Sequence, residues 1–247
     1  MTYKMKLYYI FHSGFAFETE DTIIIIDYYQ DSTENKPHEG IVHNQLLKSD
    51  KQIYVLSTHV HADHFNPIIL DWKKEIPNIR YIFSKDILEA KKAKANEATY
   101  LDSGDHYEDE NLEIDVFGST DAGVSFLIKI DNKTLFHAGD LNNWHWKDES
   151  EPQFSAEAEA FYLNELSKIS EKYTAVDIAL FPVDQRLQTD YYLGAQQFIE
   201  AIKTKLFAPM HFGIDYKGAN AFKKVAEAHN TEFLSIHKRG EEFTLNL

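Results

Sequence analysis

Four potential metal ligands stand within six residues of one another, in the sequence HVHADH at positions 59–64. Side chains alternate along an extended chain, so His59 and His61 point to the same side and suit one metal ion. The chain must then turn for Asp63 and His64 to serve a second ion. Because three loop histidines beside an aspartate have no packing rationale, this segment predicts a metal site rather than a solvated loop.

The residues available to a metal are restricted, since the chain of 247 residues has no cysteine. Thiolate zinc sites, iron–sulfur clusters and disulfides are excluded, and a metal must be held by His, Asp, Glu or water. Such ligands suit Zn²⁺ or Mn²⁺, and we expect one or two divalent ions per chain.

The charge balance is acidic, with 25 Lys and Arg against 40 Asp and Glu, a formal net charge of −15. This excess repels phosphate backbones, and the sequence has no basic cluster, so we expect no nucleic-acid partner. We also expect no membrane partner, because no apolar run approaches the roughly 18 residues of a membrane span. The absence of a secretion signal and of cysteine favours the cytoplasm. Oligomeric state cannot be read from the sequence.

The patterning predicts one domain over residues 1–247, because no linker, low-complexity tract or repeat interrupts it. Short alternating or continuous apolar stretches predict strands at Lys6–Phe11, Phe15–Glu18, Thr22–Tyr28, Gln52–Thr58, Arg80–Ser84, Leu112–Phe117, Val124–Ile130, Thr134–His137, Asp177–Val183 and Leu206–Met210, with a closing strand pair at Glu232–Ile236 and Glu241–Leu245. Helices are predicted at Pro67–Glu75, Asp86–Lys94, Ser155–Tyr173, Leu193–Thr204 and Lys217–His229. The order indicates an α/β (α+β) fold of two packed sheets with helices outside.

On these residues the sequence resembles the metallo-β-lactamase superfamily, whose signature is HxHxDH after an early strand. Three further segments in the expected order strengthen the resemblance: FHSGF at 11–15, FHAGD at 136–140 and PMHFG at 209–213. The resemblance spans nearly the whole chain. It implies a four-layer αββα sandwich with the site at one sheet edge.

The resemblance also implies a ligand set. In that superfamily the aspartate after a glycine at a strand end bridges both metals, and a late histidine completes the second site. Carried over, Asp140 is the bridging ligand and His211 the late one. One metal would then be held by Asp63, His64, Asp140 and His211, and the other by His59, His61 and Asp140.

The sequence departs from that pattern where the superfamily usually has a further histidine for the first metal. The equivalent turn reads FGSTDAGV at 117–124, and the nearby His106 is a poor substitute. Either Ser119, Thr120 or Asp121 supplies an oxygen, directly or through water, or the first site is weakened or empty. We favour Asp121 over the neutral hydroxyls, because a carboxylate is an anionic hard ligand; a plain tight turn is the alternative. The overall plan is similar to the L-ascorbate-6-phosphate lactonase subgroup, but this departure prevents transfer of that substrate.

Other candidate residues follow Asp140 or stand at strand ends. His145 is interpreted as a replacement ligand, a proton donor or a substrate contact, and Trp144 and Trp146 as walls of an apolar pocket or as packing. His12 is either near the cluster or structural, and His137 belongs to packing around the ligands. Arg186 would clamp an anionic substrate group, with Asp184 orienting it, or the two form a surface ion pair.

Together these residues predict a metal-dependent hydrolase that uses a metal-activated hydroxide on a small polar or anionic substrate, such as a lactone, amide or phosphoester. Asp63 would orient or deprotonate the water, and water or His145 would protonate the leaving group. One alternative is a non-catalytic metal-binding or ligand-sensing protein of the same fold. A nuclease is a further alternative that the acidic charge disfavours.

Overall fold

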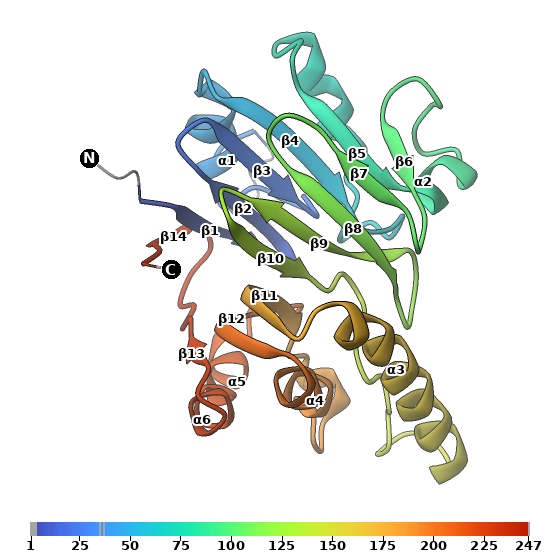
Figure 1. Cartoon of the computed structure of the whole chain (residues 1–247). Helices are drawn as coiled ribbons and strands as arrows, with labels where there is room; N and C mark the ends of the chain where they lie inside the picture. The colour runs from blue at the N-terminus through green and yellow to red at the C-terminus, as the bar shows by residue number, and fades with distance from the viewer. Residues whose placement is uncertain (1–3, 35, 37, 247) are drawn as a thin grey trace. The chain divides into compact units, whose positions relative to one another are not determined.

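The computed structural model describes residues 4–34, 36 and 38–246, which form two compact units. The first unit comprises the chain up to Leu101 together with the segment from His237 onward, and the second comprises Asp102–Ile236. The prediction of a single domain over residues 1–247 stays a prediction. Each unit contains one seven-stranded sheet, so the predicted mixed α/β fold with two sheets is confirmed (Figure 1).

The sheet of the first unit has the order β14-β1-β2-β3-β4-β5-β6. An antiparallel meander, β1 to β3, leads into parallel strands β3, β4 and β5, and β14 pairs antiparallel with β1. The strands of this sheet are β1 (Lys6–Phe11), β2 (Gly14–Glu18), β3 (Thr22–Ile26), β4 (Gln52–Ser57), β5 (Arg80–Ser84), β6 (Thr99–Leu101) and β14 (Glu241–Thr244), and its helices are α1 (Ile41–Asn44), η1 (Leu46–Lys48), η2 (Pro67–Lys74) and α2 (Lys85–Glu89).

Near-continuous apolar sequence explains the centre of this sheet. Every residue of β3 is buried, as expected of a parallel strand covered on both faces. The helix after the histidine cluster forms as predicted but winds as a 3₁₀ helix, and the side chain of Asn66 caps it by accepting a hydrogen bond from the Ile68 N–H at 3.1 Å. One core cluster packs these helices on the sheet, with Trp72 edge-on to Tyr28 at a centroid distance of 4.8 Å.

The sheet of the second unit has the order β13-β12-β11-β10-β9-β8-β7. Strands β7 to β10 form an antiparallel meander, in which β8 to β10 correspond to predicted strands, whereas β10 to β13 are parallel. The strands are β7 (His106–Glu108), β8 (Glu113–Gly118), β9 (Val124–Ile130), β10 (Lys133–His137), β11 (Ala175–Pro182), β12 (Lys203–Met210) and β13 (Glu232–Phe233), and the helices are α3 (Pro152–Lys172), η3 (Gln185–Leu187), α4 (Leu193–Ala201), α5 (Tyr216–Ala221) and α6 (Lys223–Ala228).

Several predicted elements differ from the structure. The closing strand pair is wrong, because β13 joins β12 in the second unit while β14 joins β1 in the first. The predicted helix Asp86–Lys94 ends at Glu89, and the predicted helix Lys217–His229 is divided into α5 and α6 at Phe222. The short strands β6 and β7 were not predicted, since three-residue strands carry too little alternation to be recognised.

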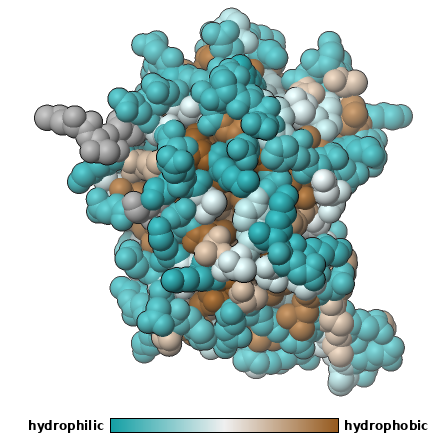
Figure 2. All heavy atoms as spheres, viewed as in Figure 1, coloured by the Kyte–Doolittle hydropathy of each residue, from teal (hydrophilic) through white to brown (hydrophobic). Residues whose placement is uncertain are grey.

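Hydrophilic residues cover most of the molecular face drawn in Figure 2, in keeping with the 26% of charged residues in the chain. Within the described part of the chain, no helix is both long enough and apolar enough to cross a bilayer.

Candidate metal centre

The first candidate ligands lie at one edge of the sheet of the first unit, where the parallel strands β3 to β5 end. The histidine segment 59–64 follows β4, Asp27 follows β3, and Asp86 lies just after β5. The turn between β1 and β2, which contains His12, reaches the same edge because β1 runs parallel to β3. Carboxyl ends of parallel strands gather polar side chains, so this placement follows from topology.

The histidine loop is tied down by its neighbours. The Val60 N–H donates to Asp86 Oδ2 at 3.1 Å, and the N–H groups of His64 and Phe65 both donate to the His61 carbonyl oxygen, at 3.0 and 2.8 Å. Nε2 of His59 lies 3.0 Å from Nδ1 of His61, the approach that their spacing predicted. Two nitrogens bound to one metal at about 2.0–2.1 Å stand at a similar separation, so this pair fits a shared ion.

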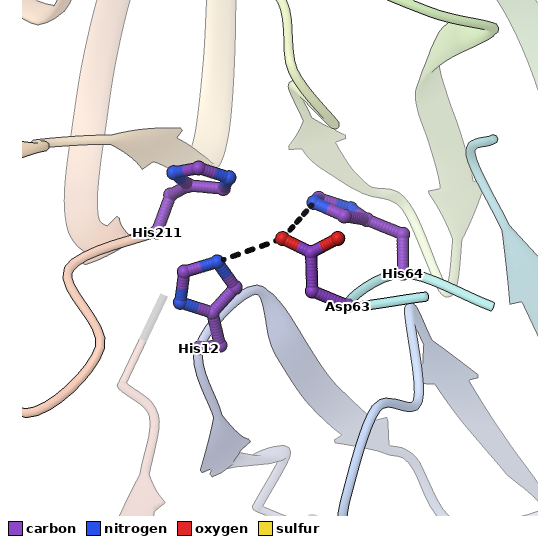
Figure 3. A group of neighbouring side chains, drawn as sticks. All are labelled: His12, Asp63, His64 and His211. Atoms are coloured by element: carbon purple, nitrogen blue, oxygen red, sulfur yellow. Dashed lines mark ion pairs between the residues drawn. The ribbon is translucent and has the colours of Figure 1, made fainter. Parts of the chain in front are cut away.

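Asp63 lies between two histidines (Figure 3). Its Oδ2 atom is 3.2 Å from Nε2 of His12 and 3.8 Å from Nε2 of His64. Burial acts to raise the pKa of Asp63, but the hydrogen bond from His12 and the electrostatic interaction with the nearby His64 ring outweigh it and hold this pKa below its usual range. The carboxylate is therefore an anion at neutral pH, as a metal ligand or a hydrogen-bond acceptor for water must be.

Asp27, which was not among the predicted site residues, orients His64. Its fully buried carboxylate accepts a hydrogen bond from Nδ1 of His64 at 2.7 Å, and from the N–H and hydroxyl of Thr58 at 2.7 Å each. Because Nδ1 carries the proton, Nε2 of His64 presents its lone pair to a metal. The available signal was an aspartate directly after the apolar strand Thr22–Ile26.

The second unit supplies two further candidates at the ends of its parallel strands. Asp140 follows β10 after a turn in which Gly139 has φ 56°, and His211 directly follows β12. Both side chains are 4% exposed, and Nε2 of His211 lies 3.3 Å from Oδ1 of Asp140. The two residues stand 71 positions apart in the chain and meet because β10, β11 and β12 are neighbouring strands.

Asp184 orients His211 as Asp27 orients His64. Oδ2 of Asp184 lies 2.9 Å from Nδ1 of His211, and the Arg186 Nε–H donates to both carboxylate oxygens at 3.0 and 2.9 Å. Burial would raise the pKa of Asp184, but hydrogen bonds from His211 and Arg186 lower it to about 2. The predicted ion pair between Asp184 and Arg186 forms. The Asp184 carboxylate also contacts His211, and the sequence did not indicate this contact.

Three candidate residues have left-handed backbones: His12 at φ 58°, Asp27 at 50° and His211 at 63°. This conformation is uncommon for residues other than glycine and collects at functional sites. Gly14 serves the same region, because a Cβ there would lie 2.9 Å from the Phe11 carbonyl oxygen and 3.0 Å from that of Asp27. The turn thus needs glycine to approach the Asp27 backbone.

Asp121 lies in the exposed turn between β8 and β9, and one of its candidate ligand atoms is within 4.8 Å of one on Asp140. The neighbouring Thr120 hydroxyl donates to the Asn142 carbonyl oxygen at 2.6 Å and accepts from the Asn142 N–H at 2.9 Å. Thr120 is therefore engaged in holding the turn. The preference for Asp121 as the ligand stays a prediction. His106 belongs to β7 and pairs with Asp115 at 2.7 Å.

His145 points both ring nitrogens at the backbone. Nδ1 accepts from the Lys147 N–H at 3.2 Å, and Nε2 lies 3.2 Å from the Asp190 carbonyl oxygen. These contacts give the imidazole a role in holding its loop. Trp144 donates from Nε1 to the Asp140 carbonyl oxygen at 2.8 Å and stacks with Trp146.

His137 is buried in β10, where its Nδ1 accepts from the Gly139 N–H at 3.1 Å. This contact shapes the turn that leads to Asp140.

The profile of the β-lactamase superfamily domain matches residues 6–211. The chain therefore belongs to the metallo-β-lactamase superfamily. Among curated proteins it is 23% identical, over 96% of this chain and 98% of the relative, to a UPF0173 metal-dependent hydrolase of Desulforamulus reducens. It is 27% identical, over 96% of this chain and 99% of the relative, to one from Nanoarchaeum equitans.

A solved structure shares the fold. The metallo hydrolase Igni18 of the archaeon Ignicoccus hospitalis superposes with a TM-score of 0.71 at 20% identity, covering 98% of this chain and 99% of that one.

Proposed function

We propose that this chain is a metal-dependent hydrolase that acts on a small polar or anionic substrate. The observation that carries the proposal is a repeated pair: a buried aspartate fixes the tautomer of a candidate ligand in each unit, Asp27 for His64 and Asp184 for His211. Such carboxylate–histidine pairs accompany metal ligation and raise the basicity of the ligand. The names of the two UPF0173 relatives, both metal-dependent hydrolases, support the same reading.

The donors divide by unit. The first donor group, in the first unit, is His59, His61, Asp63 and His64, and the second, in the second unit, is Asp121, Asp140 and His211. We propose that, in the first unit, His59 and His61 would hold one ion and Asp63 and His64 would serve another, and that Asp121, Asp140 and His211 are the metal donors of the second unit. The absence of cysteine and the mixture of imidazole and carboxylate fit Zn²⁺ or Mn²⁺.

Divalent ions held there would supply a water of lowered pKa and polarise the oxygen of the scissile bond. The residues of the chain complete the chemistry. Asp63, ionised and hydrogen-bonded to His12, is placed to orient the attacking water and accept its proton. Because His145 uses both nitrogens in its loop, water is the preferred proton source for the leaving group.

Substrate recognition is proposed for side chains beside the donors. Trp144 packs against His211 at a centroid distance of 5.5 Å and, with Trp146, offers an apolar surface. The Arg186 side chain is 63% exposed, so its outer nitrogens can bind an anionic group while Nε stays on Asp184. Lactones, as in the lactonase-like subgroup, amides and phosphoesters are the substrate classes to test.

The decisive experiment measures metal content and hydrolysis together. The purified full chain is stripped with a chelator, reloaded with Zn²⁺ or Mn²⁺, and assayed on a γ-lactone, an anilide and bis(p-nitrophenyl) phosphate. We expect two ions per chain and activity that disappears on stripping and returns on reloading. Activity that survives complete metal removal contradicts the proposal. One ion and no turnover of any substrate favours the metal-binding or sensing alternative.

A further inference from the structure

A cavity of about 330 Å³ lies in the first unit, between the short helices α1 and η1 and the 3₁₀ helix η2. Its apolar wall is formed by Leu47, Ile68 and Ile76, and His43 and Trp72 add buried polar atoms. The lining is completed by His38, Lys48, Asp71 and Glu75. None of these residues belongs to the proposed metal donors. The size, and a lining that combines an apolar wall with polar groups, suit a small-molecule site.

Two buried polar atoms belong to this wall. Trp72 is only 6% exposed, and among the residues that the structure describes no group forms a hydrogen bond with its indole Nε1. The same holds for Nε2 of His43. The two rings meet edge to face, with centroids 5.5 Å apart. Because a buried donor without an acceptor costs stability, a pair of such atoms lining one cavity indicates a bound polar group.

Asp31 fixes the form of His43. Its carboxylate is fully buried and accepts hydrogen bonds from the Ser32 and Val42 N–H groups, and from the N–H and Nδ1 of His43 at 2.9 and 2.7 Å. These contacts keep Asp31 ionised, with its pKa lowered although burial opposes this. The Nδ1–H of His43 donates to this carboxylate, and in that tautomer Nε2 is an acceptor, whereas Trp72 Nε1–H is a donor.

We propose that this cavity binds a small alcohol or phenol, whose hydroxyl oxygen accepts from Trp72 Nε1 while its proton is donated to Nε2 of His43. A hydroxyl both donates and accepts at a single atom, as this pair of polar atoms requires. The rim favours a neutral ligand, because Lys48 is offset by Asp71 and Glu75, so a carboxylate gains no net positive field. The apolar body would contact the aliphatic wall.

Phenol and benzene are matched probes, which differ only by the hydroxyl. The full chain, labelled with ¹⁵N, has three tryptophans and hence three indole N–H signals; Trp144→Phe and Trp146→Phe assign two and leave the third to Trp72. We expect phenol to move the Trp72 signal saturably and leave the other two in place. Benzene should bind at least about tenfold more weakly, because it leaves both polar atoms unpaired.

A second measurement removes the donor while keeping an aromatic ring. Trp72→Phe should weaken phenol binding about tenfold, measured by calorimetry, and Trp146→Phe should leave it unchanged. Equal affinity for phenol and benzene means an apolar void only and overturns the proposal, as does a Trp72 signal that phenol does not move. If Trp72→Phe does not fold, the comparison of the two probes on the unsubstituted chain decides.

Discussion

The two donor groups are built differently. The first comes from one loop of six residues after β4, so its ligands are adjacent in sequence, and a single motif shows them. The second is gathered from turns after β8, β10 and β12, and its members are recognisable in the sequence only through resemblance. In both groups, however, a buried aspartate fixes the tautomer of one histidine. A donor group whose residues are adjacent in sequence is therefore easier to recognise. The rigidity of each group comes from its position at the ends of the strands of its sheet.

Removal of one ligand from each group should give the largest effect. His61→Ala and His211→Ala are each expected to lower bound metal from two ions to one and to reduce kcat/KM by more than the roughly 10–100-fold that outer partners contribute. Elemental analysis and steady-state kinetics measure both quantities. His106→Ala, whose ring pairs with Asp115, is the matched control and should retain both ions. Unchanged metal content in His211→Ala would remove the second group from the site.

The orienting aspartates should come next in size. Asp27→Asn and Asp184→Asn should each weaken metal affinity roughly 10–100-fold, because the amide no longer holds a histidine in its ligating tautomer. We expect the larger loss for Asp27→Asn, since that carboxylate also binds Thr58 at the base of the histidine loop. Competition with a chromophoric chelator measures the affinity. Equal and negligible losses would show that the repeated pair is only structural.

Asp115 is a buried carboxylate outside the two donor groups, so a substitution there tests folding stability separately from metal binding. Burial would raise the pKa of Asp115, but hydrogen bonds from Tyr173, Lys172 and His106 lower it to about 2. Against an unfolded pKa of about 3.9, its stabilisation is complete above pH 4 and is lost as the pH falls from about 4 to about 2.

In the variant Asp115→Asn the free energy of unfolding should therefore be lower at pH 7, as measured by urea unfolding of the metal-free chain. It should also fall less steeply at acidic pH, in the acid limb of its pH dependence. Its metal affinity at pH 7 should equal that of the unsubstituted protein. Asp71→Asn, at an exposed carboxylate, is the control for the acid limb. A steep acid limb retained by Asp115→Asn would assign the acid sensitivity to other groups.

The smallest effect is expected at Arg186. The Arg186 side chain is 63% exposed, and an ion pair formed by such a group contributes up to about 1 kcal/mol, which is about fivefold in an equilibrium constant. Arg186→Gln should raise KM for an anionic substrate by about that factor and leave KM for a neutral ester unchanged. Equal changes in KM for both substrates would indicate that Arg186 acts through Asp184 rather than on the substrate.

Prediction from sequence succeeded where local patterns were strong. The two meanders, the parallel strands and the capped helix after Asn66 follow from apolar periodicity and one side-chain cap. It failed for the last two strands, which are close in sequence but pair in different sheets, because pairing of short polar strands is decided by the edges available to them. Asp27 was missed for a related reason: its partners Thr58 and His64 are more than 30 positions away.

The sequence by itself determined the class of donors: histidine and carboxylate without thiolate, in a motif whose spacing brings His59 and His61 together. Only the tertiary structure decided which buried carboxylates lie beside those donors and orient them. Parallel strands end at a common edge, so residues such as Asp184 and His211 become neighbours only when β11 and β12 pair. Hydrogen bonding to a buried carboxylate then selects one tautomer of each ring, a choice that depends on contacts between distant residues.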